Sequence, residues 1–264
     1  MMRNGETSPF SRLSACLEML FVKESPTFAD RIHMAHAAGF EAIEFWRWTD
    51  KDMPAIRQAL AETGLSVAGI VAEPMISLTD DNNHAAFLDG LAKTLDIASS
   101  LGAPVLIAQA GDLLADVERD RQRDNISHCL TRSADILRGS GVTLALEPLN
   151  TLVDHPGYFL SSTEEGLDIV DAVARSEIRL LYDLYHSMVM GEVPEKVLAG
   201  RVDRIVHAHI ADHPGRNEPG SGQLPLRQAM AWLDANGFRG RFGLEFRPTQ
   251  STSDALQAMA GELA

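Results

Sequence analysis

The feature that most constrains the fold is a regular alternation of short apolar runs with stretches of helical periodicity. Eight runs are rich in strand-forming residues, and dividing the 264 residues among them leaves about 33 residues for each. That length fits one strand followed by one helix, and eight such units close into a barrel of about 250 residues. The expected strands are Leu13–Leu17, Ala42–Phe45, Ser66–Val71, Pro104–Ala108, Val142–Leu146, Ile178–Tyr182, Arg204–Ile210 and Phe242–Phe246.

The segments between these runs carry helix start and stop signals. Glycine follows the first three predicted helices, and Ser162-Thr163-Glu164-Glu165 is a capping-box pattern that opens another. We therefore predict an α/β fold: a single (β/α)₈ TIM barrel domain over residues 1–264, with residues 1–11 as a flexible N-terminus. The expected helices are Thr27–Ala38, Pro54–Thr63, Asn83–Leu101, Asp116–Arg138, Ser162–Ala174 and Leu226–Asn236, with shorter ones near Pro194–Leu198 and Thr252–Glu262.

The rival fold is a doubly wound open sheet. That fold more often carries a glycine-rich phosphate loop after its first strand, and residues 18–22 contain no glycine. The same observation argues against a nucleotide cofactor.

Composition excludes several classes of partner. The net charge of −14 opposes binding to nucleic acid or to an anionic membrane, because both require a basic surface. The sequence has no run approaching the roughly 18 apolar residues of a membrane span, and residues 1–11 lack the apolar stretch of a signal peptide. With only two cysteines, far apart at Cys16 and Cys129, a cytoplasmic protein is expected.

Chemically active side chains follow four consecutive predicted strands. Glu147 follows the fifth strand, Asp183 the sixth and Glu245 lies at the end of the eighth, while His209 lies near the end of the seventh. The carboxyl ends of barrel strands form one rim, where TIM-barrel enzymes place their active sites. These four side chains are therefore expected to meet, and the small residues Ala145 and Gly243 would leave them room.

Three carboxylates in a confined site repel one another and are poorly solvated, so a positive charge is needed among them. Oxygen donors with one imidazole favour Mn²⁺, Mg²⁺ or Co²⁺, whereas a structural zinc site would typically contain cysteine. Taken singly, each acid has a simpler interpretation as a turn or cap residue. We interpret His207, two residues before His209, as a buried neighbour of the cluster rather than a ligand.

Two further residues are candidates for substrate binding. His186 lies beyond the sixth strand and is either a substrate contact or a loop residue, and Arg216 lies in a loop with two glycines and two prolines nearby. An arginine there is suited to clamp an anionic or hydroxylated substrate, with a surface arginine as the alternative. The histidines at 33, 36 and 84 have helical spacing without nearby acids and are interpreted as surface residues.

Around these residues the chain resembles hydroxypyruvate isomerases and the related 2-oxo-tetronate isomerases, within the xylose-isomerase-like barrel superfamily. The resemblance implies a divalent metal held by Glu147, Asp183, His209 and Glu245, with Glu147 and Glu245 also acting as the acid/base pair. It also implies that His186 and Arg216 contact substrate. The stretches that carry it are Leu146–Thr151, Pro156–Thr163, Tyr182–His186 and Ile210–Gly222, within the segment Val142–Pro248.

One position departs from this pattern. The isomerases place a glutamine where His209 stands, whereas ketose 3-epimerases place a histidine there. The resemblance implies enediolate proton transfer that isomerises a small hydroxy-oxo acid, either hydroxypyruvate to tartronate semialdehyde or a 2-oxo-tetronate. A ketose 3-epimerase is the alternative, followed by a metal-dependent phosphoester hydrolase or endonuclease and by a non-catalytic binding protein. Barrels of this sort often associate through their outer helices, so a homo-oligomer, a dimer or a tetramer, is expected.

Overall fold

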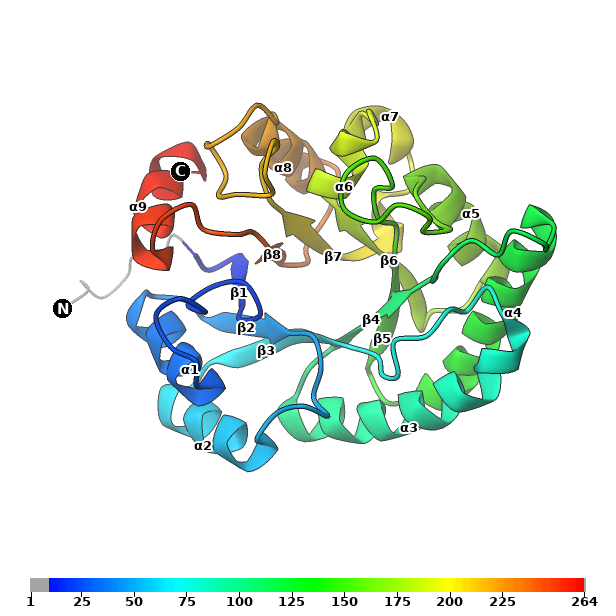
Figure 1. Ribbon diagram of the computed structural model, residues 1–264, viewed down its shortest axis with the longest axis horizontal. Helices are drawn as coiled ribbons and strands as arrows, with labels where there is room; N and C mark the ends of the chain where they lie inside the picture. The colour runs from blue at the N-terminus through cyan, green and yellow to red at the C-terminus, as the bar shows by residue number, and fades with distance from the viewer. Residues whose placement is uncertain (1–9, 264) are drawn as a thin grey trace.

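The computed structural model describes residues 10–263, whose eight parallel strands close into a barrel in sequence order (Figure 1). The last strand, β8, pairs with β1 through Leu13 and Phe242. The predicted TIM barrel is thus confirmed. Its strands are β1 (Leu13–Cys16), β2 (Ala42–Phe45), β3 (Ser66–Val71), β4 (Val105–Gln109), β5 (Thr143–Glu147), β6 (Ile178–Asp183), β7 (Ile205–Ile210) and β8 (Phe242–Leu244).

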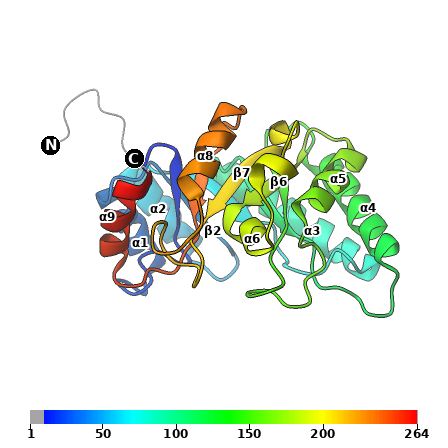
Figure 2. The same cartoon turned by 90° about the horizontal axis from the view of Figure 1, so that it is seen from above.

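The helices surround the strands, and the C-terminal helix lies beside the first helix in both views (Figures 1 and 2). The helices are α1 (Phe28–Ala37), α2 (Met53–Thr63), α3 (His84–Leu101), α4 (Arg119–Leu137), α5 (Thr163–Val173), α6 (Leu184–Val189), α7 (Pro194–Val197), α8 (Leu226–Ala235) and α9 (Thr252–Leu263), with 3₁₀ turns η1 (Asp81–Asn83) and η2 (Val202–Arg204).

The helix signals in the sequence act as predicted, with one difference. Helices α2 and α3 end at Gly64 and Gly102, whose φ angles of 73° and 67° are easily adopted only by glycine. The Ser162 side chain accepts a hydrogen bond from the Glu165 amide, as a capping box requires. The Glu165 carboxylate, however, pairs with Arg119 on α4 and so ties two helices together.

Two apolar clusters form the core. The larger lies between the strands and the surrounding helices, and the smaller, composed of Val71, Val105, Ile107, Ala145 and Leu181, lies inside the barrel. Because strand side chains alternate between faces, the residues two positions further along face the same interior. Burial of each large apolar side chain contributes about 1.5–3 kcal/mol. The smaller apolar cluster thus lies directly beneath the polar side chains that follow two residues later, nearer the carboxyl rim.

Most of the predicted flexible N-terminus, residues 1–11, lies outside the described residues. Phe10 and Ser11 are described: they form a turn, and the Phe10 ring stacks on Phe40 with 4.8 Å between ring centroids. Within residues 10–263, no helix has both the length and the apolar character needed to cross a membrane.

Candidate active site

The strand register brings the four predicted site residues to one rim. Glu147 and Asp183 are the last residues of β5 and β6, and Asp183 pairs in register with His209 on β7. His209 in turn pairs with Gly243 on β8, and Glu245 lies two residues further along. Each side chain lies two positions beyond an inward-facing residue, which explains why all four point into the barrel mouth.

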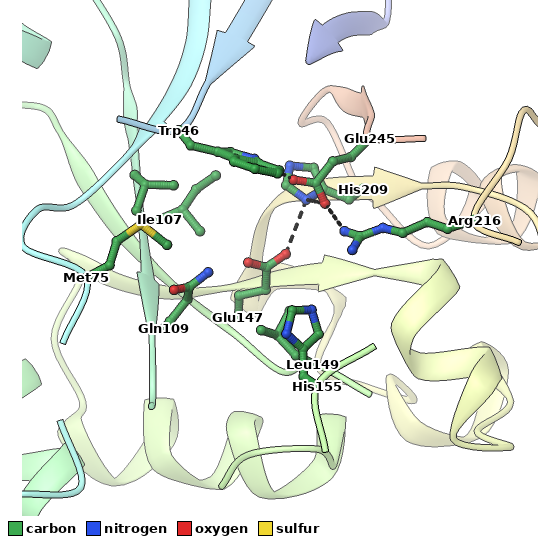
Figure 3. Close-up of a pocket in the computed structure, with 11 residues that line it drawn as sticks. Trp46, Met75, Ile107, Gln109, Glu147, Leu149, His155, His209, Arg216 and Glu245 are labelled. Carbon is green, nitrogen blue, oxygen red and sulfur yellow. Dashed lines mark hydrogen bonds and ion pairs between the residues drawn. The ribbon is translucent and has the colours of Figure 1, made fainter. Parts of the chain in front are cut away.

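The imidazole of His209 lies at the centre of this cluster (Figure 3). Its Nδ1 atom is 3.2 Å from Glu147 Oε1, 3.5 Å from Glu245 Oε2 and 3.9 Å from Asp183 Oδ2. One donor atom from each of the four residues lies within 4.8 Å of the others. The cluster is the one that strand-end reasoning anticipated.

All four side chains are buried, and the cluster strongly perturbs their pKa values. Burial raises the pKa of Glu147 and of Asp183, because a buried carboxylate is poorly solvated. Burial acts in the same direction on Glu245, but the charges of Arg216 and His209 outweigh it and lower the pKa of Glu245. Burial disfavours a charged His209, yet the carboxylates of Glu245 and Glu44 raise the pKa of His209 well above its usual value.

The guanidinium of Arg216 reaches the same cluster, so the alternative of a surface arginine is wrong. The side chain is buried, donates to Glu245 Oε2, and lies 5.6 Å from the ring centroid of Tyr185. Its backbone has a φ of 54°, which is unfavourable for a residue with a Cβ atom. The surrounding loop holds this conformation through the Asp212 carboxylate, which accepts hydrogen bonds from the amides of residues 220, 222 and 224.

His186 lies in the first turn of α6, a helix that the sequence did not reveal. The Asp183 carboxylate caps this helix by accepting from the His186 amide. The Nδ1 atom of His186 accepts a hydrogen bond from the backbone amide of Asn150, so the proton of the neutral ring is on Nε2. That Nε2 atom is buried, lies 3.6 Å from Asp183 Oδ2 and has no hydrogen-bond partner among residues 10–263. Burial lowers the pKa of His186 well below its usual value.

A cavity of about 160 Å³ opens beside the cluster, with an apolar wall opposite the charged one (Figure 3). Sequence analysis did not select Trp46, Gln109 or His155 as site residues. The Trp46 indole donates to Glu245 Oε1 at 2.8 Å. Trp46 directly follows β2, and this position at a strand end could have indicated that it belongs to the site. Gln109 ends β4, one residue beyond the predicted strand end. The cavity is lined by Trp46, Val71, Met75, Ile107, Gln109, Glu147, Leu149, His155, His209, Arg216 and Glu245.

The interpretation of His84 as a surface residue is also wrong. Its ring is buried, and Nε2 lies 3.0 Å from the carbonyl oxygen of Leu78. His84 is the first residue of α3, its ring contacts the loop before this helix, and it is not part of the cluster around His209. The histidines at 33 and 36 are exposed, as expected.

The donor set of Glu147, Asp183, His209 and Glu245 suits a divalent cation. Three carboxylates and one imidazole are donors that Mn²⁺, Mg²⁺ and Co²⁺ accept, and a cation would offset the repulsion among the buried acids. A second group, composed of Glu44, His207 and His209, lies just below. There Glu44 Oε2 is 2.8 Å from both His207 Nε2 and Ser14 Oγ, so these residues form an internal hydrogen-bond network.

A closed parallel barrel with acids and an imidazole gathered at its carboxyl rim is the architecture of a TIM-barrel enzyme. The profile of the family described as xylose isomerase-like TIM barrel matches residues 32–261, and the chain belongs to this family. It is 31% identical over 253 residues to the 2-oxo-tetronate isomerase of Cupriavidus necator, with 93% of this chain and 96% of that protein covered.

It is also 27% identical over 262 residues to the hydroxypyruvate isomerase of Escherichia coli K12, with 94% of this chain and 98% of that protein covered. Among solved structures, one described as AP endonuclease, family 2 from Brucella melitensis matches with a TM-score of 0.89 and 28% identity, over 95% of this chain and 98% of that one. The resemblance inferred from the sequence is confirmed, and the names of the two relatives agree with the predicted enzyme class, an isomerase.

Proposed function

We propose that the protein is a metal-dependent isomerase of the aldose–ketose type that acts on a small hydroxy-oxo acid. Hydroxypyruvate, converted to tartronate semialdehyde, and a 2-oxo-tetronate are the substrates that fit. The observation that carries the proposal is the convergence of Glu147, Asp183, Glu245 and His209 around one point, with the buried guanidinium of Arg216 beside it. The names of the two relatives support the same substrate class.

The size of the cavity supports a small substrate. Its volume is about 160 Å³. Pockets for drug-sized ligands measure roughly 300–1,000 Å³. Two buried donors near the cluster have no hydrogen-bond partner in the described part of the chain: Nε of Arg216, which lines the cavity, and Nε2 of His186, which does not. A buried unpaired donor costs about 1–3 kcal/mol, so substrate oxygens that accept from them relieve this penalty. We assign Arg216 and His186 to substrate binding.

Glu147, Asp183, His209 and Glu245 would hold the cation, for which Mn²⁺, Mg²⁺ and Co²⁺ are the candidates. When bound, such a cation would polarise a substrate carbonyl and lower the pKa of the adjoining C–H bond. Glu147 and Glu245 carry the carbon-bound proton: one carboxylate removes it from the carbon that bears the hydroxyl group, and it returns at the neighbouring carbon. The hydroxyl proton passes to the former carbonyl oxygen, so that the carbonyl and hydroxyl groups exchange places. The environments of the two carboxylates differ, because Trp46 and Arg216 both donate to Glu245. Pairs of acids in unequal environments are suited to opposite proton-transfer roles.

A ketose 3-epimerase is the second candidate, and the histidine at position 209 favours it. In an epimerisation the proton returns to the same carbon from the opposite face, for which two carboxylates also suffice. A nuclease is the weakest candidate, because a net charge of −14 repels a polyanionic substrate.

Proton exchange in deuterated water tests this proposal. The protein, loaded with Mg²⁺, is offered hydroxypyruvate and a panel of ketoses, and deuterium incorporation is followed by NMR. Exchange confined to the hydroxy-oxo acids supports the isomerase, whereas exchange at C3 of ketoses supports the epimerase. Glu147→Gln is the control, because it keeps the size of the side chain and removes its basicity. Absence of exchange on every compound contradicts both candidates.

Two properties of the protein accompany this function as proposals. Cytoplasmic location fits the two buried cysteines, Cys16 and Cys129, which are unpaired. We expect a homo-oligomer, a dimer or a tetramer, because barrels of this sort often associate through their outer helices. Light scattering measures the molar mass and so tests this expectation.

A further inference from the structure

We propose that Glu44 is a positioning residue for His209: its carboxylate fixes the imidazole so that Nδ1 faces the cation site. Glu44 lies on β2, on the far side of His209 from the three acidic cluster residues. The inference rests on the metal centre of the proposed function and concerns a residue outside its ligand set.

The contacts of His209 divide between its two ring nitrogens. Nδ1 faces Glu147, Asp183 and Glu245, as described above, while Nε2 lies 3.1 Å from Glu44 Oε1. The two atoms are close enough for an ion pair, and neither has a hydrogen-bond partner among the described residues. Each of these two buried atoms is therefore the available partner of the other. When Nδ1 acts as a ligand, the ring proton lies on Nε2, where a carboxylate accepts it.

Glu44 is itself held in place by two other residues. Its second oxygen, Oε2, accepts from Ser14 Oγ on β1 at 2.8 Å and lies 2.8 Å from His207 Nε2 on β7. The Glu44 side chain is only 3% exposed. Three strands thus fix one carboxylate, which is costly to bury unless it is fully paired. Such an arrangement is suited to orienting a neighbouring ring.

Gly243 on β8 provides the space for this contact. A Cβ atom added there would lie 2.3 Å from Glu44 Oε1, 2.6 Å from Glu44 Oε2 and 2.6 Å from His209 Cδ2. All three distances are far below ordinary van der Waals contact, so any other residue at 243 would displace Glu44, His209 or both. Glycine at this position is explained by the Glu44–His209 pair, since Gly243 has an ordinary backbone conformation that other residues adopt.

The first experiment measures Mn²⁺ affinity by calorimetric titration of Glu44→Met, Glu44→Gln and wild type. Methionine removes both acceptor oxygens at similar size, and we expect a loss of about 10–100-fold, the usual effect of removing a partner of a metal-bound histidine. Glutamine keeps one acceptor and should recover part of the loss. Glu73→Met is the matched control, because Glu73 is also a buried acid near a strand end but accepts from Trp48 and Thr49 instead. Its affinity should stay within about threefold of wild type.

The second experiment tests whether the His209 ring contacts the bound Mn²⁺. Pulsed electron paramagnetic resonance of the Mn²⁺-loaded protein detects coupling to an imidazole nitrogen, which we expect in wild type and in Glu73→Met and expect to be weakened in Glu44→Met. If Glu44→Met does not fold, Gly243→Ala tests the same contact with Glu44 present, and it should reduce both affinity and nitrogen coupling.

The outcomes separate this inference from the proposed function. Wild-type affinity and unchanged coupling in Glu44→Met, or in Gly243→Ala where only that variant folds, overturn the positioning role and leave the metal centre intact. A wild-type protein that binds no Mn²⁺ overturns both. A loss that is equal in Glu44→Met and Glu73→Met would mean a general effect of a buried acid and would also refute the role assigned to Glu44.

Discussion

Replacing Arg216 by methionine should destabilise the metal-free protein far more than an ordinary surface substitution. The guanidinium is buried and donates to Glu245, and its charge also acts on Asp183 and Glu147. Removing one partner of a buried ion pair costs about 3–5 kcal/mol, because the other charge is left uncompensated. For a chain of this size, 1 kcal/mol corresponds to about 2–4 °C, so Tm should fall by roughly 6–20 °C. Methionine also carries a Cβ atom, so the left-handed backbone at 216 is strained equally in both proteins.

Thermal unfolding followed by circular dichroism, with EDTA and then with excess Mn²⁺, tests the origin of this loss. A dication in the cluster supplies the positive charge that the variant lacks, so the difference in Tm should shrink when Mn²⁺ is present. Arg204→Met is the matched control, because Arg204 pairs with Asp171 and Asp203 in an exposed position, and its loss should cost no more than about 1 kcal/mol. A metal-free Arg216→Met protein that unfolds within about 2 °C of wild type would refute the charge argument. An equal loss with and without Mn²⁺ would assign the effect to loop packing.

Three further predictions follow from the same cluster and its surroundings. With free Mn²⁺ at about 100 times its Kd for the protein, removing the Mn²⁺ should lower the free energy of unfolding by about 2.7 kcal/mol, which is roughly 5–11 °C in Tm. Calorimetric scans that coincide with and without EDTA would contradict this. Glu147→Gln and Glu245→Gln should each reduce deuterium exchange about 100-fold or more, and undiminished exchange in either variant would remove that residue from the acid/base pair. Hydrogen bonds from Asn150 and Tyr185 outweigh partial burial and lower the pKa of Asp154 below 3.8, so its stabilising effect is complete above that pH and is lost as the pH falls through its lower folded-state pKa. The difference in urea stability between wild type and Asp154→Asn should therefore narrow below about pH 4, and a pH-independent difference would refute this.

Much of the barrel and of the cluster at its carboxyl rim was predictable because strand side chains alternate. Glu147 lies two residues beyond inward-facing Ala145, and Asp183 two beyond inward-facing Leu181, so the rim side chains follow from the interior ones. The eight strands were recognisable since each is a short apolar run between helix signals. These features are local in the chain, and the closure of the barrel then brings them together.

Residues that depend on loops and on strand irregularities were harder to predict. His155 lies in the loop between β5 and α5, where no periodicity places a side chain. The pairing of β6 with β7 shifts in register after Leu180, so that His207 lies opposite Leu181 and His209 opposite Asp183. An irregularity of this kind changes the direction in which the side chains of a strand point, and a single sequence does not reveal it. Helix α6 has only six residues, and the Asp183 side chain caps it while also facing the cluster.

The contact between Glu44 and His209 illustrates a further limit and its physical cause. Glu44 lies 165 residues before His209 in the chain, and the apolar run around it gives no sign that its carboxylate reaches across the barrel. What makes the contact possible is the missing Cβ atom at Gly243, on a third strand. Only the closed barrel fixes the distances among β2, β7 and β8, because β8 joins β7 on one side and β1 on the other. The proposed cation site therefore depends on barrel closure as well as on its candidate ligands, and a substitution at Gly243 should impair the site without altering any residue proposed to hold the cation.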